Sequence, residues 1–155
     1  MNLNDAIIRL RDSGTRPRRV RRPGKPLVLV VDDIVEQRDL YEYFLASYFE
    51  LVSAARGPEA IAIAVARQPD AIVLDVEMPE MNGMEVCRRL KRHKDTAAIP
   101  VLMLTGTPDD VHVDAREAGA AAVLKKPCSV DALLEQILGS IITAQALARA
   151  EDDSV

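Results

Sequence analysis

The chain contains little of what several protein classes need. Among its 155 residues there is no tryptophan, only 3% are aromatic, and the two cysteines, Cys87 and Cys128, lie far apart. So few aromatic residues disfavour an aromatic-rich β-sandwich, and two distant cysteines disfavour a disulfide framework and favour a reducing compartment. No apolar run reaches the length of a membrane span, and no apolar stretch follows the N-terminal charges as in a secretory signal. We therefore expect a cytoplasmic protein with no membrane span.

Positive charge is concentrated near the N-terminus. Residues 1–26 carry eight basic and two acidic side chains, a net charge of +6, so the total of −4 leaves −10 on the other 129 residues. An acidic main body disfavours nucleic acid as its principal ligand. The basic segment is compatible with an acidic partner, an anionic membrane, nucleic acid or simply a solvated tail, and its scarcity of aromatic residues weakens the nucleic-acid alternative.

Short apolar runs alternate with helical patterns along the rest of the chain. Runs at 27–31, 71–74, 101–104 and 121–124, with a weaker one at 50–54, are typical of buried parallel strands. Helical patterns occupy 34–48, about 58–67, 84–93, 108–118 and the segment from residue 129 onward. Thr107 is a plausible cap for the fourth of these helices. Five βα units in this order predict an α/β domain, with a parallel sheet covered by helices on both faces.

The same pattern divides the chain into three parts. We expect residues 1–25 to form a flexible basic arm, in which 1–12 could form a short helix, and residues 26–143 to form the folded domain. Residues 144–155 should extend the last helix and end in an acidic tail that frays from about residue 150.

Polar residues follow four of the predicted strands. They are Asp32 and Asp33 after the first run, Asp75 after 71–74, Thr105 after 101–104, and Lys125 and Lys126 after the last. In open parallel sheets the carboxyl ends of the strands share one edge, and ligands bind there. A single Asp at a strand end is ordinarily a turn former, but agreement at four strand ends predicts a site. Oxygen ligands without a nearby His or Cys indicate Mg²⁺ rather than zinc.

Charge balance indicates phosphoryl chemistry on Asp75. Three carboxylates, one Mg²⁺ and one lysine sum to zero. Converting Asp75 to an acyl phosphate leaves the site at about −1 with the metal and about −3 without it. A carboxylate nucleophile, a metal that bridges phosphoryl oxygens and a positioned cation are the usual parts of such a reaction.

Four stretches of the chain resemble the receiver domains of two-component response regulators. They are VLVVDD (28–33), VLDVEMPEMNGMEV (73–86), VLMLTG (101–106) and GAAAVLKKP (119–127). The resemblance implies a doubly wound, flavodoxin-like (βα)5 three-layer sandwich with strand order 2-1-3-4-5. It also implies that a sensor histidine kinase or a histidine phosphotransfer protein supplies the phosphoryl group.

The resemblance also implies roles for individual residues. Asp75 would be the phosphoacceptor, and Asp32 and Asp33 would hold Mg²⁺ together with the backbone carbonyl of Glu77, whose side chain need not take part. Thr105 and Lys126 would bind the phosphoryl group, and the bond before Pro127 would be cis. Lys125 should point elsewhere, because side chains alternate along a strand.

Two positions depart from the family pattern. Many receivers have Tyr or Phe three residues before the lysine, a ring that responds to the hydroxyl at the Thr105 position; here the residue is Val123. The residue after the proline is commonly Phe, and here it is Cys128. The usual coupling between threonine and aromatic ring is therefore not expected, and the route by which activation reaches the surface stays open.

The resemblance suggests an output through protein contacts. Only about a dozen residues follow the predicted domain, so we expect a single-domain regulator with no DNA-binding domain, which signals through a face at about 108–142 or passes the phosphoryl group on in a phosphorelay. The extended last helix could also support a homodimer. Two alternatives are a pseudo-receiver, disfavoured because no site residue is lost, and a Mg²⁺-dependent phosphatase, disfavoured because Ile34 and Val35 stand where a second Asp would be needed.

Overall fold

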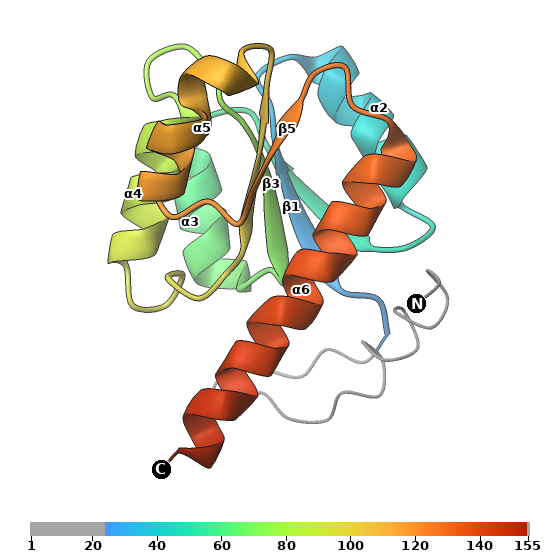
Figure 1. Ribbon diagram of the computed structural model, residues 1–155. Coiled ribbons are helices and arrows are strands. Elements are labelled where there is room, and N and C mark those ends of the chain that lie inside the picture. Colours follow the sequence, from blue (N-terminus) through green and yellow to red (C-terminus); the bar gives the residue numbers. More distant parts are fainter. Residues whose placement is uncertain (1–23, 155) are drawn as a thin grey trace.

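The computed structural model describes residues 24–154, and these form five strands and five helices in strict alternation (Figure 1). The strands are β1 (Leu27–Val31), β2 (Glu50–Ala54), β3 (Ala71–Asp75), β4 (Val101–Thr105) and β5 (Ala122–Lys125). The helices are α2 (Val35–Leu45), α3 (Gly57–Arg67), α4 (Gly83–Arg92), α5 (Pro108–Glu117) and α6 (Val130–Asp153). The predictions for the basic arm and for a helix at 1–12 fall on residues 1–23, which lie outside the described part.

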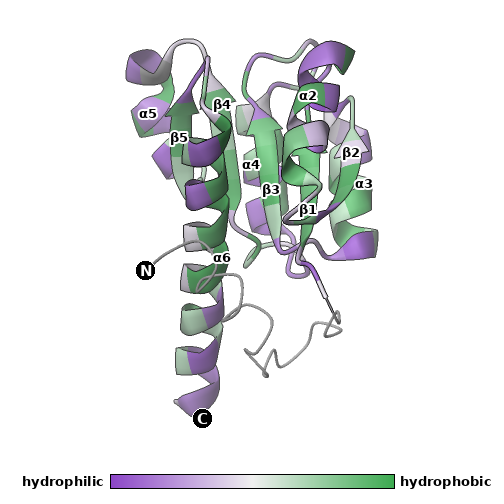
Figure 2. Cartoon of the chain, turned by 90° about the vertical axis from the view of Figure 1, so that its right-hand side faces the viewer, coloured by the Kyte–Doolittle hydropathy of each residue, from purple (hydrophilic) through white to green (hydrophobic). Residues whose placement is uncertain are grey.

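The five strands form one parallel sheet in the order β2-β1-β3-β4-β5. This confirms the predicted α/β doubly wound architecture and the strand order that the resemblance implied. β1, β3 and β4 are buried along their whole length, because helices cover both of their faces. Figure 2 shows the apolar residues along β1 and β3 that fit this double burial.

Alternate side chains of the strands pack into two hydrophobic cores, one on each side of the sheet. On one side Leu29, Ile72 and Met103 pack against α3, α4 and α5, and on the other Val30, Val73 and Leu104 pack against α2 and α6. Figure 1 shows the same two groups of helices on opposite sides of the sheet. The period of two along each strand therefore accounts for the three layers.

The ends of several helices differ from the predicted ones. α2 ends at Leu45 rather than at residue 48, because the chain turns there and buries Phe49 in the core before β2 begins. Thr107 occupies the N-cap of α5, but its side chain makes no capping bond. By contrast, the side chains of Asn82 at the N-cap of α4 and Ser129 at the N-cap of α6 accept hydrogen bonds from the amides of Glu85 and Ala132.

The last helix is longer than expected. We predicted fraying from about residue 150, but α6 continues to Asp153 and extends past the lower edge of the sheet in Figure 1. By length and composition it is the one helix in residues 24–154 that could cross a membrane, and this counts against the expected absence of a membrane span. A single such helix is a weak indication, and five of its apolar side chains are buried in the domain core (Leu133, Leu134, Ile137, Leu138 and Ile141).

Candidate functional site

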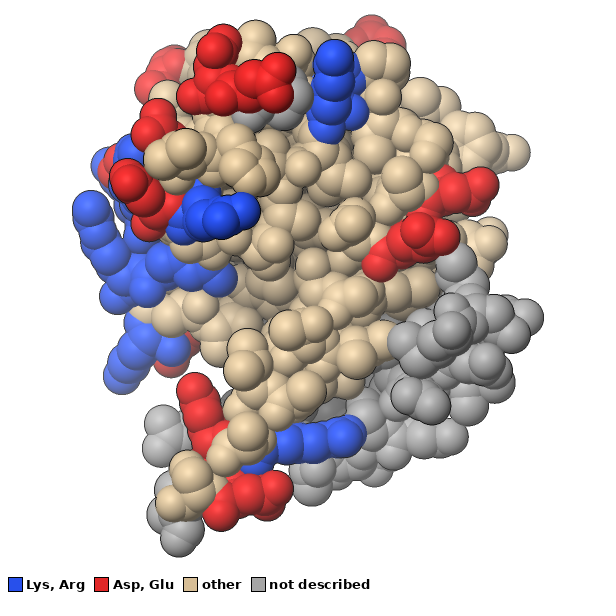
Figure 3. Space-filling view, viewed as in Figure 1, with Lys and Arg blue, Asp and Glu red and all other residues tan. Residues whose placement is uncertain are grey.

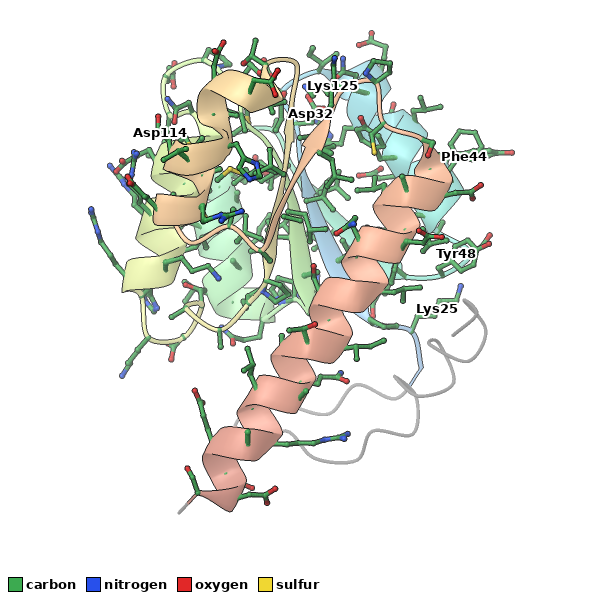
Figure 4. The ribbon with its side chains drawn as sticks, viewed as in Figure 1. Lys25, Asp32, Phe44, Tyr48, Asp114 and Lys125 are labelled. Atoms are coloured by element: carbon green, nitrogen blue, oxygen red, sulfur yellow. The ribbon has the colours of Figure 1, made fainter. Side chains whose placement is uncertain are left out.

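The carboxyl ends of four strands bring the predicted residues together at one edge of the sheet. Asp75 is the last residue of β3 and Thr105 the last of β4, while Asp32 follows β1 and Lys126 follows β5. Figure 4 labels Asp32 and Lys125, which mark this edge. The parallel arrangement explains the convergence, because all carboxyl ends then point the same way.

Three carboxylates form a compact cluster. Asp32, Asp33 and Asp75 each offer an oxygen atom, and these atoms lie within 4.8 Å of one another. Asp32 and Asp75 are only 2% and 1% exposed. One buried oxygen of each, Oδ2 of Asp32, Oδ1 of Asp33 and Oδ2 of Asp75, has no hydrogen-bond partner among the described residues.

Such a cluster is costly unless a cation neutralises it. Buried carboxylate oxygens without partners, grouped with no sulfur or imidazole ligand from residues 24–154, fit a hard divalent cation that is bound by oxygen. The donor set is therefore suited to Mg²⁺, and Asp32, Asp33 and Asp75 are the side chains that could hold it.

Lys126 supplies one positive charge to the cluster. Its Nζ donates to Oδ1 of Asp75 at 2.7 Å, while the backbone amide of Glu77 donates to the same oxygen at 3.2 Å. The peptide bond between Lys126 and Pro127 is cis, as the resemblance implied. The other oxygen of Asp75, Oδ2, has no hydrogen-bond partner among the described residues, so one carboxylate oxygen is held and the other is available.

The acid Asp32 is positioned by backbone contacts. Its Oδ1 accepts the amide of Ile34 at 2.9 Å, and Arg38 Nη1 from α2 donates to its backbone carbonyl at 2.7 Å. The guanidinium of Arg38 thus ties the first turns of α2 to the end of β1. Sequence reasoning missed Arg38; its signal is a basic residue one helical turn beyond the acid pair.

The side chain of Glu77 also belongs to the site. Its Oε1 accepts hydrogen bonds from the hydroxyl of Thr105 and from the amide of Gly106, the latter at 3.0 Å, and its Oε2 lies 3.9 Å from Nζ of Lys126. We expected only the backbone of Glu77 to matter. A carboxylate two residues after Asp75 was a visible signal, but its partner on β4 lies 28 residues away in sequence.

Burial and charge shift the pKa values at this edge in opposite directions. Burial raises the pKa of Asp75 to about 6 against the lowering effect of Lys126, and burial likewise raises the pKa of Asp32. Burial would also raise the pKa of Glu77, but its hydrogen bonds from Thr105 and Gly106 outweigh this and lower it. Burial opposes the charge on Lys126, yet Asp75 raises its pKa overall. Burial is therefore the main cost of keeping Asp32 and Asp75 ionised in this site.

A glycine allows the loop after β3 to close over Asp75. A Cβ on Gly83, the first residue of α4, would lie 2.5 Å from the backbone oxygen of Asp75 and 2.8 Å from Cα of Val76. The Gly83 amide donates to the carbonyl of Val76 at 3.0 Å. Only glycine permits so close an approach of backbone to backbone.

Comparison with known proteins places this geometry in a family. The family model described as "Response regulator receiver domain" matches residues 28–138. The chain belongs to the response regulator receiver domain family. Receiver domains are signalling modules of two-component systems, and the four matching stretches seen in the sequence all lie within these residues.

Individual relatives support the same assignment. The receiver domain is 44% identical over 104 residues to the response regulator PleD of Caulobacter vibrioides. The aligned region covers 64% of this chain and 22% of PleD. It is 37% identical over 115 residues to the transcriptional regulator RpaA of Synechocystis, covering 72% of this chain and 47% of RpaA. The chain thus spans between about a fifth and a half of these relatives.

Solved structures agree in fold. The chemotaxis protein CheY4 of Vibrio cholerae superposes with a TM-score of 0.71 at 31% identity, over 76% of this chain and 99% of CheY4. The receiver domain of the sensor histidine kinase PA1611 of Pseudomonas aeruginosa, which was crystallised with a magnesium ion in its active-site cleft, has a TM-score of 0.71 at 22% identity, over 76% and 98% of the two chains. The second likeness concerns the fold alone.

The two departures from the family pattern are packed into the receiver domain. Val123 on β5 is partly buried against the core beneath α3, α4 and α5, and it pairs with Met103 of β4. Cys128 is partly buried against the opposite core. Neither position contains a ring that could turn inward when Thr105 moves.

Proposed function

We propose that this receiver domain accepts a phosphoryl group on Asp75 from a phosphohistidine partner in a Mg²⁺-dependent reaction, and that it signals through phosphorylation-dependent protein contacts or a phosphorelay. The observation that carries the proposal is the buried Asp75 carboxylate, which Lys126 contacts at one oxygen and which clusters with the carboxylates of Asp32 and Asp33. The site supports its own phosphotransfer and a slow loss of the phosphoryl group by hydrolysis.

The residues of the chain would divide the work as follows. A carboxylate oxygen of Asp75 forms a bond to phosphorus while the P–N bond of the phosphohistidine breaks, and the imidazole leaves with the electron pair and takes up a proton. Lys126 balances charge on the acceptor, and the Thr105 hydroxyl donates to a phosphoryl oxygen once it arrives. Asp32, Asp33, Asp75 and the backbone carbonyl of Glu77 would hold Mg²⁺, and the bound ion would neutralise negative charge on the phosphoryl group.

An exposed apolar surface beside the acid pair suits a protein donor. Most of the large exposed hydrophobic side chains of residues 24–154 lie on α2 or at its N-cap: Ile34, Val35, Leu40, Tyr43 and Phe44. Phe44, labelled in Figure 4, lies on the outer side of α2. Because exposed apolar side chains clustered on one helix are typical of interaction sites, we expect the phosphodonor protein to bind α2.

The output surface would be the face formed by α5, β5 and α6, at about 108–142. Figure 3 views this face and shows a broad uncharged area over its centre, with acidic and basic side chains mainly toward the margins. Protein interfaces commonly have such a centre and such a rim. The cytoplasmic location and the single-domain organisation, with no attached DNA-binding domain, stay predictions.

Intact mass measurement tests the proposal directly. Wild-type chain incubated with Mg²⁺ and acetyl phosphate should gain the mass of one phosphoryl group, whereas Asp75→Ala and EDTA-treated wild type should not. An unmodified wild type would favour the pseudo-receiver alternative, and an unchanged adduct on Asp75→Ala would show that the acceptor is wrong. Continuous release of phosphate from many unrelated phosphate esters would favour the phosphatase alternative.

A further inference from the structure

Glu77 occupies the hydrogen-bond donors that a phosphoryl group on Asp75 would need. Its Oε1 accepts from the Thr105 hydroxyl and the Gly106 amide, and its Oε2 lies 3.9 Å from Nζ of Lys126. Thr105 is fully buried, and apart from Glu77 the acceptor within reach of its hydroxyl among the described residues is the Thr107 hydroxyl, at the longer distance of 3.4 Å. The three donors come from the ends of β4 and β5, and they converge on one side chain from the end of β3.

A carboxylate and a phosphoryl group demand the same kind of donors. Both are anions that accept short, charge-assisted hydrogen bonds from hydroxyl, amide and ammonium groups. A phosphoryl group attached to Asp75 would lie beside the same Thr105 and Lys126 that Glu77 now contacts. Two anions cannot share these donors without strong repulsion, so one of them has to leave.

We propose that the Glu77 side chain is an internal competitor for the phosphoryl site, which binds Thr105 and Gly106 in the unphosphorylated chain and is displaced when Asp75 is phosphorylated. The inference rests on the proposed function of Asp75. It assigns Glu77 a role that its backbone carbonyl does not have: its carboxylate opposes phosphorylation and holds Thr105 in the unphosphorylated arrangement.

Displacement needs little rearrangement of the domain. The Glu77 side chain is 47% exposed, compared with 1% for Asp75, so it can reach solvent by rotation about its own side-chain bonds. β3 and the sheet can stay in place while this happens. Removal of the competing charge should therefore strengthen phosphoryl binding without altering the fold.

Glu77→Gln tests the inference, and Glu80→Gln is its matched control. Both remove one negative charge from the loop between β3 and α4, but Glu80 makes none of the hydrogen bonds to Thr105 or Gly106 among the described contacts. Binding of beryllofluoride, a phosphoryl analogue, is measured at saturating Mg²⁺ by NMR titration of backbone amides. We expect Glu77→Gln to bind about ten-fold more tightly than wild type, which matches the loss of one strong charged contact, and Glu80→Gln to stay within about two-fold.

A second readout needs no phosphate or metal. In the metal-free chain the Gly106 amide should exchange faster with solvent and shift its proton resonance in Glu77→Gln and Glu77→Ala, but not in Glu80→Gln. An unchanged Gly106 amide in both Glu77 variants would overturn the inference, because the proposed contact would then not exist in solution.

The outcomes separate the two proposals. Failure of wild type to bind beryllofluoride with Mg²⁺ would contradict the proposed function itself. Tight binding by wild type, with equal or weaker binding by Glu77→Gln and Glu77→Ala, would leave the proposed function standing and overturn the competitor role. A separate Mg²⁺ titration should give affinities within about two-fold for all these variants, since the Glu77 contribution to the metal is its backbone carbonyl.

Discussion

Asp75 combines two properties that conflict until a cation binds beside it. It is almost completely buried, and its carboxylate lies among other carboxylates. Burial favours the protonated form, while Lys126 favours the charged form, and the result is a pKa raised to about 6. The residue is thus poised for chemistry at the expense of stability, a common property of functional sites.

Replacement of Asp75 should stabilise the metal-free domain. The pKa of Asp75 is about 6 in the folded state, against 3.8 for an ordinary Asp, so the folded state holds the proton more tightly than the unfolded state. The free energy of unfolding therefore falls as the pH rises from about 4 to 6, and the full loss of stability is reached above that range. Asp75→Asn should therefore raise the free energy of unfolding at pH 7.5 by about 1–3 kcal/mol in EDTA. Urea unfolding at pH 7.5 and pH 5 checks this, with the difference smaller at pH 5.

The opposite result would be informative. If Asp75→Asn were less stable than wild type at pH 7.5, the ion pair with Lys126 would outweigh the cost of burial. Addition of Mg²⁺ should stabilise wild type more than the variant, because the ion relieves the repulsion that Asp75→Asn already removes.

Gly83 is expected to be intolerant of any side chain. Gly83→Ala would force backbone atoms of Asp75 and Val76 apart, and should cost about 1–3 kcal/mol of stability and slow phosphorylation by acetyl phosphate. Gly139→Ala is the control, since a Cβ there meets no atom within 4 Å and alanine favours the helix. Chemical unfolding of both variants checks this, and equal effects of the two would contradict the steric argument.

At the scale of elements, the helices divide into those that support the sheet and those that expose apolar surface. α4 buries one face and exposes a basic one, whereas α2 buries only Leu45 completely and exposes most of its large apolar side chains. A helix that leaves so much apolar surface in solvent is more easily explained by a partner than by folding. Because α2 begins close to Asp33, such a partner would lie beside the proposed phosphorylation site.

Val35→Ser should impair phosphotransfer from a protein but not from a small molecule. Loss of a half-exposed apolar side chain on α2 should slow transfer from a phosphorylated histidine phosphotransfer protein about ten-fold, while the rate with acetyl phosphate stays the same. Val113→Ser on α5, which removes a side chain of 65% exposure away from α2, is the control. Intact mass measurement gives the rate of phosphorylation with each donor. An equal loss of rate with the protein donor and with acetyl phosphate would indicate damage to the site instead.

At the scale of the whole molecule, α6 is the feature that extends beyond the compact domain. Its buried face ends with Ile141, and the helix then continues for three further turns to Asp153. Between this extension and the segment before β4 lies a hollow of about 530 Å³, lined at one end by Leu147, which is 63% exposed. The domain core does not account for this part of the chain.

Self-association through the α6 extension stays a prediction that light scattering can check. If two copies meet there, wild type should form a dimer at high concentration, and Leu147→Asp should shift it to monomer by placing a charge in an apolar contact. Ala146→Asp, about 100° around the helix, should have a smaller effect. A monomeric wild type across the concentration range would show that the prediction is wrong.

The sequence by itself determined the architecture and the place of the site, because both depend on local patterns. Short, uninterrupted apolar runs and the polar residues after each run identify the parallel strands and their common edge. The tertiary structure alone decided how side chains meet across that edge. The bonds of Glu77 to Thr105 and Gly106 depend on the register of β3 against β4, in which Asp75 pairs with Leu104. The raised pKa of Asp75 likewise depends on burial by distant elements, which no local pattern encodes.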